Sequence, residues 1–208
     1  MIPFILTILV VFAVLILNEW WWRGRTHGEI SRKAVHISIG TFVAFWPLFL
    51  AWWQIELLSL AFVMVVSVSQ KLRIFRAIHT VQRPTWGELL FAMSVGLVAF
   101  TTHNPAIYAV ALLHMSLADG LAAITGVKYG ASQAYVVFGS RKSVVGTLTF
   151  AVVSTAIMAS FALQQHTGFH FSYVLLIAAA TLLENLAVRG LDNLLIPLLV
   201  AFVLSRVS

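Results

Sequence analysis

Long apolar segments separated by short polar ones dominate this chain. The segments cover residues 2–20, 34–50, 52–69, 87–102, 105–126, 146–163, 171–188 and 191–206. Most reach the roughly 17–25 residues that an α-helix needs to cross the hydrocarbon core of a bilayer, and the last is short for a span. The pattern therefore predicts an all-α, polytopic membrane helix bundle with about 7–8 transmembrane helices.

The composition supports a membrane protein and excludes several classes of site. The chain has 208 residues, of which 61% are hydrophobic and 10% are charged, too apolar for a soluble domain with a wet surface. The segments leave no room for a separate soluble domain, so we expect one integral-membrane domain over residues 1–208. The chain has no cysteine, which excludes disulfides, thiolate nucleophiles and Cys-based metal sites.

The positions of the basic residues predict the orientation in the membrane. The chain has 13 Lys and Arg residues and a formal charge of +6. If the N-terminus lies outside, the inner loops hold every one of these cations except Arg206. The positive-inside rule therefore places those loops in the cytoplasm. Because the cations fall in short loops between apolar segments, we expect no nucleic-acid partner. The apolar start of the chain, without a preceding basic region, predicts an uncleaved first span.

A single acid, Asp119, interrupts the apolar run over residues 106–126. A carboxylate within a membrane segment is costly and marks a functional site by default, although a buried acid paired for structure gives the same pattern. Small residues follow it on nearly one helical face, at Ala122, Gly126 and Gly130. Such a face admits either another helix or a ligand, and both interpretations are open.

The polar segment 138–147 carries adjacent cations and glycines. Arg141 and Lys142 are suited to neutralise phosphates. Ser143 is suited either to donate to a phosphate oxygen or to cap the next helix. A helix that begins there directs its N-terminus at the cytoplasm, where it favours an anion. Inner loops also carry Lys and Arg for topology, so this segment by itself is weak evidence.

Two further clusters lie at predicted inner helix ends. Arg32, Lys33 and His36 share one helical face at the start of the second segment, and either a packed or a catalytic histidine is open there. Glu184 lies near the inner end of its segment, and Asp192 and Asn193 open the last one. Asp192 is suited to cap that helix, or the oxygen ligands together could hold Mg²⁺.

All three clusters therefore fall on the predicted cytoplasmic side, which favours a common site. The chain lacks a G-x-x-x-x-G-K-[ST] loop, the H-R-D and D-F-G motifs of protein kinases, H-E-x-x-H and G-x-S-x-G. These absences exclude the familiar sequence signatures of P-loop enzymes, protein kinases, zinc peptidases and serine hydrolases.

Four motifs, in order, resemble those of the CTP-dependent polyprenol kinases, a family that includes dolichol, phytol and farnesol kinases and the CTP-dependent diacylglycerol kinase. The similarity spans roughly residues 31–200. The motifs are R-K-A-V-H-I-S-I-G at 32–40, D-G-L-A-A-I-T-G-V-K-Y-G at 119–130, K-S-V-V-G-T at 142–147, and Glu184 followed by D-N-L-L-I-P at 192–197. The motif sequences are most similar to those of the phytol/farnesol branch, because Val145 stands where dolichol kinases tend to carry an acid.

The resemblance implies transfer of the γ-phosphoryl group of CTP, with Mg²⁺, to a lipid alcohol in the bilayer, at the cytoplasmic face. It implies Asp119 and Asp192 as metal ligands and a catalytic set of Asp119, Lys142, His36 and Glu184. Either His36 or Glu184 would orient or deprotonate the hydroxyl. The residues implied for nucleotide binding are Arg32, Lys33, Ala122, Gly126, Lys128, Gly130, Arg141, Ser143, Gly146 and Asn193. We expect Asp119→Asn to abolish transfer and leave folding nearly intact.

Several alternatives stay open at this point. The acceptor could be phytol, geranylgeraniol, farnesol, a longer polyprenol or diacylglycerol. A phosphatidate cytidylyltransferase uses CTP in a related architecture, but its acidic C-terminal signature is absent from this chain. A small membrane transporter would have polar residues near mid-bilayer and often inverted repeats, whereas the ionisable residues here gather at one predicted face.

Overall fold

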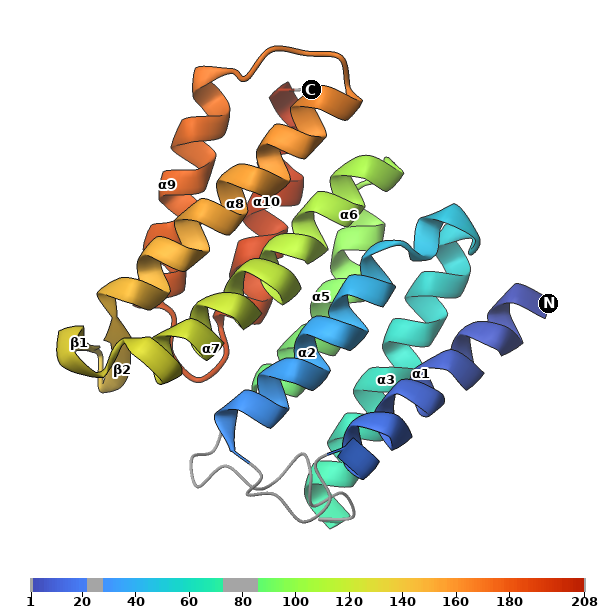
Figure 1. The fold of residues 1–208 in the computed structure, drawn as a ribbon. Coiled ribbons are helices and arrows are strands. Elements are labelled where there is room, and N and C mark those ends of the chain that lie inside the picture. Colours follow the sequence, from blue (N-terminus) through green and yellow to red (C-terminus); the bar gives the residue numbers. More distant parts are fainter. Residues whose placement is uncertain (1, 22–27, 73–85, 208) are drawn as a thin grey trace.

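The computed structural model describes residues 2–21, 28–72 and 86–207, and these form a bundle of α-helices with one small hairpin (Figure 1). The all-α prediction is therefore confirmed. The loop cations at 23, 25, 73, 76 and 83, which carry part of the orientation argument, lie outside the described residues. The number of spans and the outside N-terminus stay predictions.

Each predicted apolar segment corresponds to a helix or to a helix with a short continuation. The helices are α1 (Ile2–Trp21), α2 (Glu29–Ala44), α3 (Trp52–Leu72), α5 (Gly87–Thr101), α6 (Pro105–Leu113), α7 (Asp119–Tyr129), α8 (Val144–Gln164), α9 (Phe171–Leu186) and α10 (Asp192–Val207). Short 3₁₀ turns occupy Trp46–Leu48 and Ala131–Gln133. The second predicted segment differs most, since α2 begins at Glu29 and the 3₁₀ turn completes it.

Polar caps fix where two of these helices begin. The Asn104 side chain accepts hydrogen bonds from the first free N–H groups of α6, and Pro105 occupies the first helical position, where no N–H is needed. Ser143 caps α8 by accepting from the Gly146 N–H at 3.1 Å, as one of its two predicted roles requires. These caps place the polar segments between helices where the sequence predicts them.

Apolar surface covers much of the outside of the bundle. Two helical stretches, Pro105–Tyr129 and Val144–Gln164, are long and apolar enough to cross a membrane. Large apolar side chains are exposed on several other helices, among them Ile2, Phe100 and Phe171. Soluble monomers rarely expose contiguous apolar surface on this scale, so the exterior suits contact with lipid.

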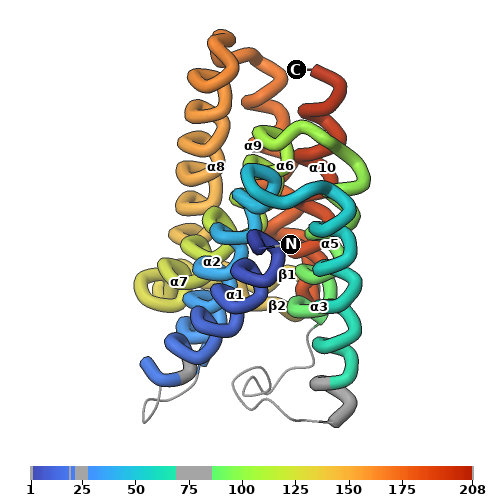
Figure 2. Tube along the Cα trace, turned by 90° about the vertical axis from the view of Figure 1, so that its right-hand side faces the viewer, coloured from blue at the N-terminus to red at the C-terminus, as the bar shows by residue number. Residues whose placement is uncertain are grey.

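The helices pack so that α7 lies against both α2 and α8, and α10 lies against α5, α6 and α9. Fully buried side chains such as Tyr108, Met115 and Phe150 fill the space between them. The hairpin and the end of α7 lie at the lower end of the bundle in Figure 1, and the α8–α9 connection lies at the upper end. Figure 2 shows the same separation from the side.

A π-helical turn at His114–Ala118 joins α6 to α7 and was not predicted. The backbone N–H of Asp119 bonds the His114 carbonyl, five residues back, instead of the Met115 carbonyl that a regular α-helix would use. The Met115 carbonyl is thereby released and accepts a hydrogen bond from His36 Nε2 at 3.0 Å. The π turn thus prepares a contact with α2 directly beside Asp119.

A β-hairpin occupies most of the polar segment between α7 and α8. Strands β1 (Ala134–Val137) and β2 (Ser140–Ser143) pair antiparallel. The two-residue turn between them has positive φ at both positions, 45° at Phe138 and 77° at Gly139, as a type I′ turn requires. Because Tyr135 and Lys142 are cross-strand partners, their side chains leave the same face of the hairpin.

Candidate active site

A buried ion pair between α2 and α7 forms the centre of the site. The Lys33 ammonium donates to Asp119 Oδ2, and the two residues are 5% and 3% exposed. Burial lowers the pKa of Lys33, but the Asp119 and Asp192 carboxylates together outweigh burial and leave that pKa raised. Lys33 is therefore an ammonium ion at neutral pH, and it neutralises the only acid within the 106–126 run.

His36 lies one turn further along α2, on the same side as Lys33. Its Nε2 is 3.7 Å from Asp119 Oδ2 and bonds the Met115 carbonyl. A carbonyl only accepts, so Nε2 carries the proton and Nδ1 is the nitrogen that can accept one. The face shared by Lys33 and His36, predicted from their spacing, is thus turned towards α7.

Arg32 lies at the same end of α2 but points to other carboxylates. Its guanidinium bonds both oxygens of Glu29, at 2.5 and 3.2 Å, and its Nη1 is 3.8 Å from Glu88 Oε1 at the start of α5. A fork of this kind fixes the orientation of the guanidinium. Glu88 belongs to none of the four motifs, and the structure places it at the periphery of the site.

The hairpin brings a second charged pair to the end of α9. Lys142 Nζ donates to the Glu184 carboxylate and to the Glu184 carbonyl, each at 2.5 Å. From the same face of the hairpin, the Tyr135 hydroxyl bonds Asn185 Oδ1 and lies 2.7 Å from Thr147 Oγ1. Thr147 also donates to Asn185 Oδ1 at 2.9 Å. Consecutive residues of α9 are thereby held by cross-strand partners of the hairpin.

The start of α10 completes the site and is anchored to α5. Asn193 Nδ2 donates to the Gly87 carbonyl at 2.9 Å, and the Trp86 N–H donates to the Arg189 carbonyl at 3.1 Å. Asp192 lies within electrostatic range of Asp119, Lys33 and Lys142, and its buried Oδ1 has no hydrogen-bond partner among the described residues. A buried carboxylate oxygen without a donor is costly, which suits a site that binds a cation.

The residues predicted for the site divide into a converging group and an outer group. Asp119 is an electrostatic neighbour of the cations on α2 and of Lys142, and Glu184 is a neighbour of both aspartates. Lys128 and Arg141 are exposed instead, and the Lys128 ammonium lies 5.1 Å from the centre of the Tyr129 ring. A role for these two cations in nucleotide binding stays a prediction.

The small residues that follow Asp119 pack α7 against the start of α8. A Cβ added at Gly130 would lie 2.3 Å from Ser143 Oγ, and one added at Gly126 would lie 2.9 Å from the same atom. A Cβ at Gly146 would lie 3.0 Å from the Ala122 carbonyl. Close helix packing therefore accounts for glycine at these positions, and contact with a nucleotide stays a prediction.

The carboxylates of the site fit Mg²⁺ only as a partial set of ligands. Within the described ranges, no group of three or more His, Asp or Glu side chains is arranged to hold a metal ion. Mg²⁺ commonly takes only one or two protein carboxylates and completes its shell with phosphates and water. The unpartnered Oδ1 of Asp192, in electrostatic range of Asp119, fits that smaller requirement.

Some site residues escaped the sequence analysis. Tyr135 reaches the site through a contact that no spacing along the chain reveals. Glu29 precedes Arg32 by three residues, so helical spacing could have found that pair. Thr147 stood in the K-S-V-V-G-T motif without a role. Asn185 follows Glu184 directly in the chain, but its partners lie on the hairpin and α8. The Met115 carbonyl became available only through the π turn.

The sequence is similar to that of a known enzyme. The chain is 34% identical to a phytol kinase from Synechocystis sp. over 180 residues, which cover 82% of this chain and 76% of that relative. No family model matches the chain. No solved structure matches it.

Proposed function

The chain belongs to the phytol kinase family, and on that premise we propose that it transfers the γ-phosphoryl group of CTP to an isoprenoid alcohol. The proposal extends the family assignment in three respects: the nucleotide, the class of alcohol and the place of the reaction. The nucleotide rests on the motif resemblance to CTP-dependent polyprenol kinases. The similarity to a phytol kinase favours an isoprenoid alcohol over diacylglycerol.

The observation that carries the proposal is the convergence of charged groups from α2, α7, the hairpin, α9 and α10. Lys33 and Asp119 lie beside His36, while Lys142 and Glu184 lie within electrostatic range of the same aspartate. Phosphoryl transfer needs mainly positioning and cations that face developing charge, and it needs few covalent roles from the protein. Lys33 and Lys142 supply such cations, because each could exchange its carboxylate partner for a phosphate oxygen.

In the proposed reaction the lipid hydroxyl oxygen forms a bond to the γ-phosphorus of CTP. The bond from that phosphorus to the β,γ-bridging oxygen breaks, and CDP leaves with the electron pair. The hydroxyl proton passes to Glu184 or to Nδ1 of His36. Lys142 and Lys33 turn from their carboxylate partners towards phosphate oxygens, and Arg32 adds charge at the edge of the site.

Asp119 and Asp192 are the residues that would hold Mg²⁺. The metal, when bound, would neutralise charge on the triphosphate. In the structure Asp119 is paired with the Lys33 ammonium. Nucleotide binding is proposed to move this ammonium towards the phosphate oxygens, and the bound cation would then neutralise the Asp119 carboxylate. Oδ1 of Asp192 has no partner in the described part of the chain, so no ammonium would have to move before it binds a cation.

We place the reaction at the cytoplasmic face of a membrane. The apolar exterior supports a bilayer location, and the cations of the predicted inner loops support the orientation. The site occupies the end of the bundle that carries the hairpin (Figure 1). A lipid alcohol in the bilayer and a cytosolic nucleotide would meet at that end.

The test is a transfer assay on the purified protein in nanodiscs. γ-Labelled CTP, ATP, GTP and UTP are each offered with farnesol, geranylgeraniol, phytol and diacylglycerol. We expect labelled lipid monophosphate and stoichiometric CDP with CTP and an isoprenoid alcohol. Phosphatidate is offered as a further acceptor, and release of pyrophosphate with formation of CDP-diacylglycerol from it would instead identify a cytidylyltransferase. Labelling of diacylglycerol alone would identify the diacylglycerol branch.

A further inference from the structure

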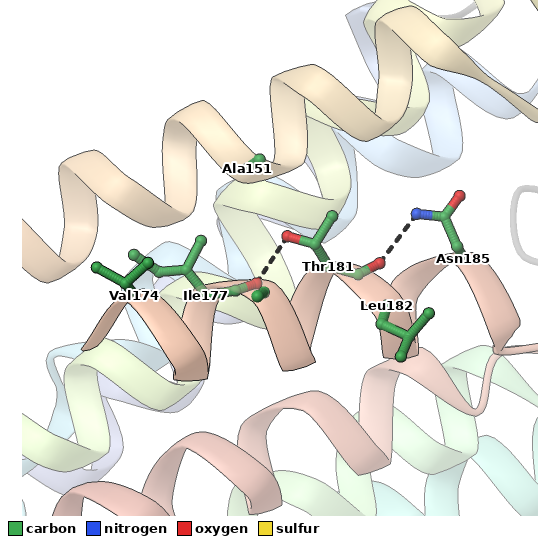
Figure 3. A pocket seen from close by; sticks show the side chains of 7 residues that line it. Ala151, Val174, Ile177, Thr181, Leu182 and Asn185 are labelled. Carbon is green, nitrogen blue, oxygen red and sulfur yellow. Dashed lines mark hydrogen bonds between the residues drawn. The ribbon is translucent and has the colours of Figure 1, made fainter. Parts of the chain in front are cut away.

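A groove between α8 and α9 opens next to the site and has no role so far. Its volume is about 530 Å³, within the range of about 300–1,000 Å³ typical of small-molecule sites. It is lined by Ala151 of α8 and by Val174, Ile177, Ala178, Thr181, Leu182 and Asn185 of α9 (Figure 3). The side chains at one end are apolar, and the amide of Asn185 closes the other.

The polar end of the groove meets the charged site directly. Asn185 Oδ1 accepts hydrogen bonds from Thr147 and Tyr135, and its Nδ2 donates to the Thr181 carbonyl at 2.9 Å (Figure 3). The preceding residue, Glu184, holds Lys142. A hydroxyl placed at this end therefore finds donors and acceptors, one residue from a carboxylate able to take its proton.

We propose that this groove binds the hydrocarbon chain of the lipid alcohol, with the hydroxyl at Asn185 and the chain running towards Val174. The inference rests on the proposed kinase function and assigns its acceptor site. Val174 and Asn185 are 11 residues apart on α9, which corresponds to about 16 Å along the helix. Several isoprene units laid lengthwise fit that distance.

The lining favours one branched chain over two straight ones. Ala151 and Ala178 leave room on both walls, where the methyl branches of an isoprenoid can lie. The lining is one strip of residues along α9 with Ala151 of α8 beside it, whereas diacylglycerol carries two chains from one headgroup. The groove therefore selects for a single-chain alcohol, which strengthens the phytol-like assignment over the diacylglycerol alternative.

The first experiment fills the groove from either wall. Ala178→Phe and Ala151→Phe are compared with Ala156→Phe, a matched control at an exposed alanine of α8 outside the groove. We expect the ratio of kcat/KM for phytol to kcat/KM for a five-carbon prenol to fall about tenfold or more in both groove variants, because each ring displaces at least two methylene groups from apolar surface. The control should keep the wild-type ratio.

The second experiment reads binding without turnover. A C20 isoprenoid alcohol carrying a diazirine near its far end is cross-linked to the wild-type protein in nanodiscs, and labelled peptides are mapped. We expect label in 144–164 and 171–186 that excess phytol removes and that Ala178→Phe lowers. Label elsewhere, or label that excess phytol leaves in place, would overturn the groove assignment.

The two proposals fail in different ways. Specific cross-linking without phosphoryl transfer to any alcohol would refute the kinase function and keep the groove as a lipid-alcohol site. Transfer by the wild type, with groove variants that behave like Ala156→Phe, would keep the kinase and refute the groove.

Discussion

Lys33 and Asp119, 86 positions apart in the chain, form a buried ion pair that joins α2 to α7. Both residues are buried, 5% and 3% exposed, so each charge depends on the other. The pair changes what a substitution at Asp119 does. From the sequence alone we expect Asp119→Asn to leave folding nearly intact, whereas in the structure the change strands the Lys33 ammonium in the core.

We therefore predict that Asp119→Asn loses both activity and stability. Removing one partner of a buried pair typically costs about 3–5 kcal/mol, because the other charge is left uncompensated. The turnover should fall at least ~100-fold through loss of electrostatic stabilisation. Thermal unfolding in detergent and the transfer assay measure the two effects on the same sample.

The double variant Lys33→Met/Asp119→Asn separates the two effects. It removes the stranded charge and keeps similar side-chain volume, so stability should recover while activity stays lost. A double variant that regains transfer would contradict a role for Asp119 in the chemistry. A single Asp119→Asn variant that unfolds at the wild-type temperature would contradict the burial of the pair.

The raised pKa of Lys33 predicts an alkaline loss of stability specific to this pair. A group with a raised folded-state pKa stabilises the fold fully below its ordinary pKa of 10.5 and loses that contribution as the pH rises through the folded-state value. The loss should therefore begin only above pH 10.5. Unfolding temperatures of the wild type and Lys33→Met/Asp119→Asn are measured from pH 8 to 11.5. Their difference should stay constant up to that point, and beyond it the wild-type value should fall relative to that of the double variant.

Glu184 is the better placed of the two candidate bases. It lies next to Asn185 at the polar end of the groove, whereas His36 lies beside the Lys33–Asp119 pair. We expect Glu184→Gln to lower kcat about 100-fold or more and to remove the acidic limb of the pH–rate profile. His36→Asn serves as the comparison and should retain that limb, and the reverse pattern would assign the base to His36.

The glycine at position 130 is predicted to be structurally required. A methyl group there would lie 2.3 Å from Ser143 Oγ and 2.6 Å from the Gly126 carbonyl, and backbone cannot yield cheaply. Gly130→Ala should destabilise the protein by about 1–3 kcal/mol through overpacking. Gly168→Ala is the matched control, since nothing lies within 4 Å of its added Cβ, and its unfolding temperature should stay near that of the wild type.

Much of the fold was predictable because the helices follow from local sequence. Runs such as 146–163 are apolar over a helix length, and polar caps such as Ser143 and Asn104 mark helix starts by residue chemistry alone. The hairpin was harder, since its two four-residue strands lack alternation strong enough to stand out from a loop. The π turn leaves no composition signal at all, because it is a one-residue change in hydrogen bonding.

The sequence by itself determined which residues are chemically unusual: an acid within an apolar run, cations and a histidine on one helical face, and acids at the end of a late segment. It also determined the family, since those residues stand in motif order. Only the tertiary structure decided the partners, placing Lys33 on Asp119, Lys142 on Glu184 and Asn185 at the mouth of a groove. Periodicity fixes which face of a helix a side chain occupies, but which helix that face meets depends on packing between segments distant in the chain.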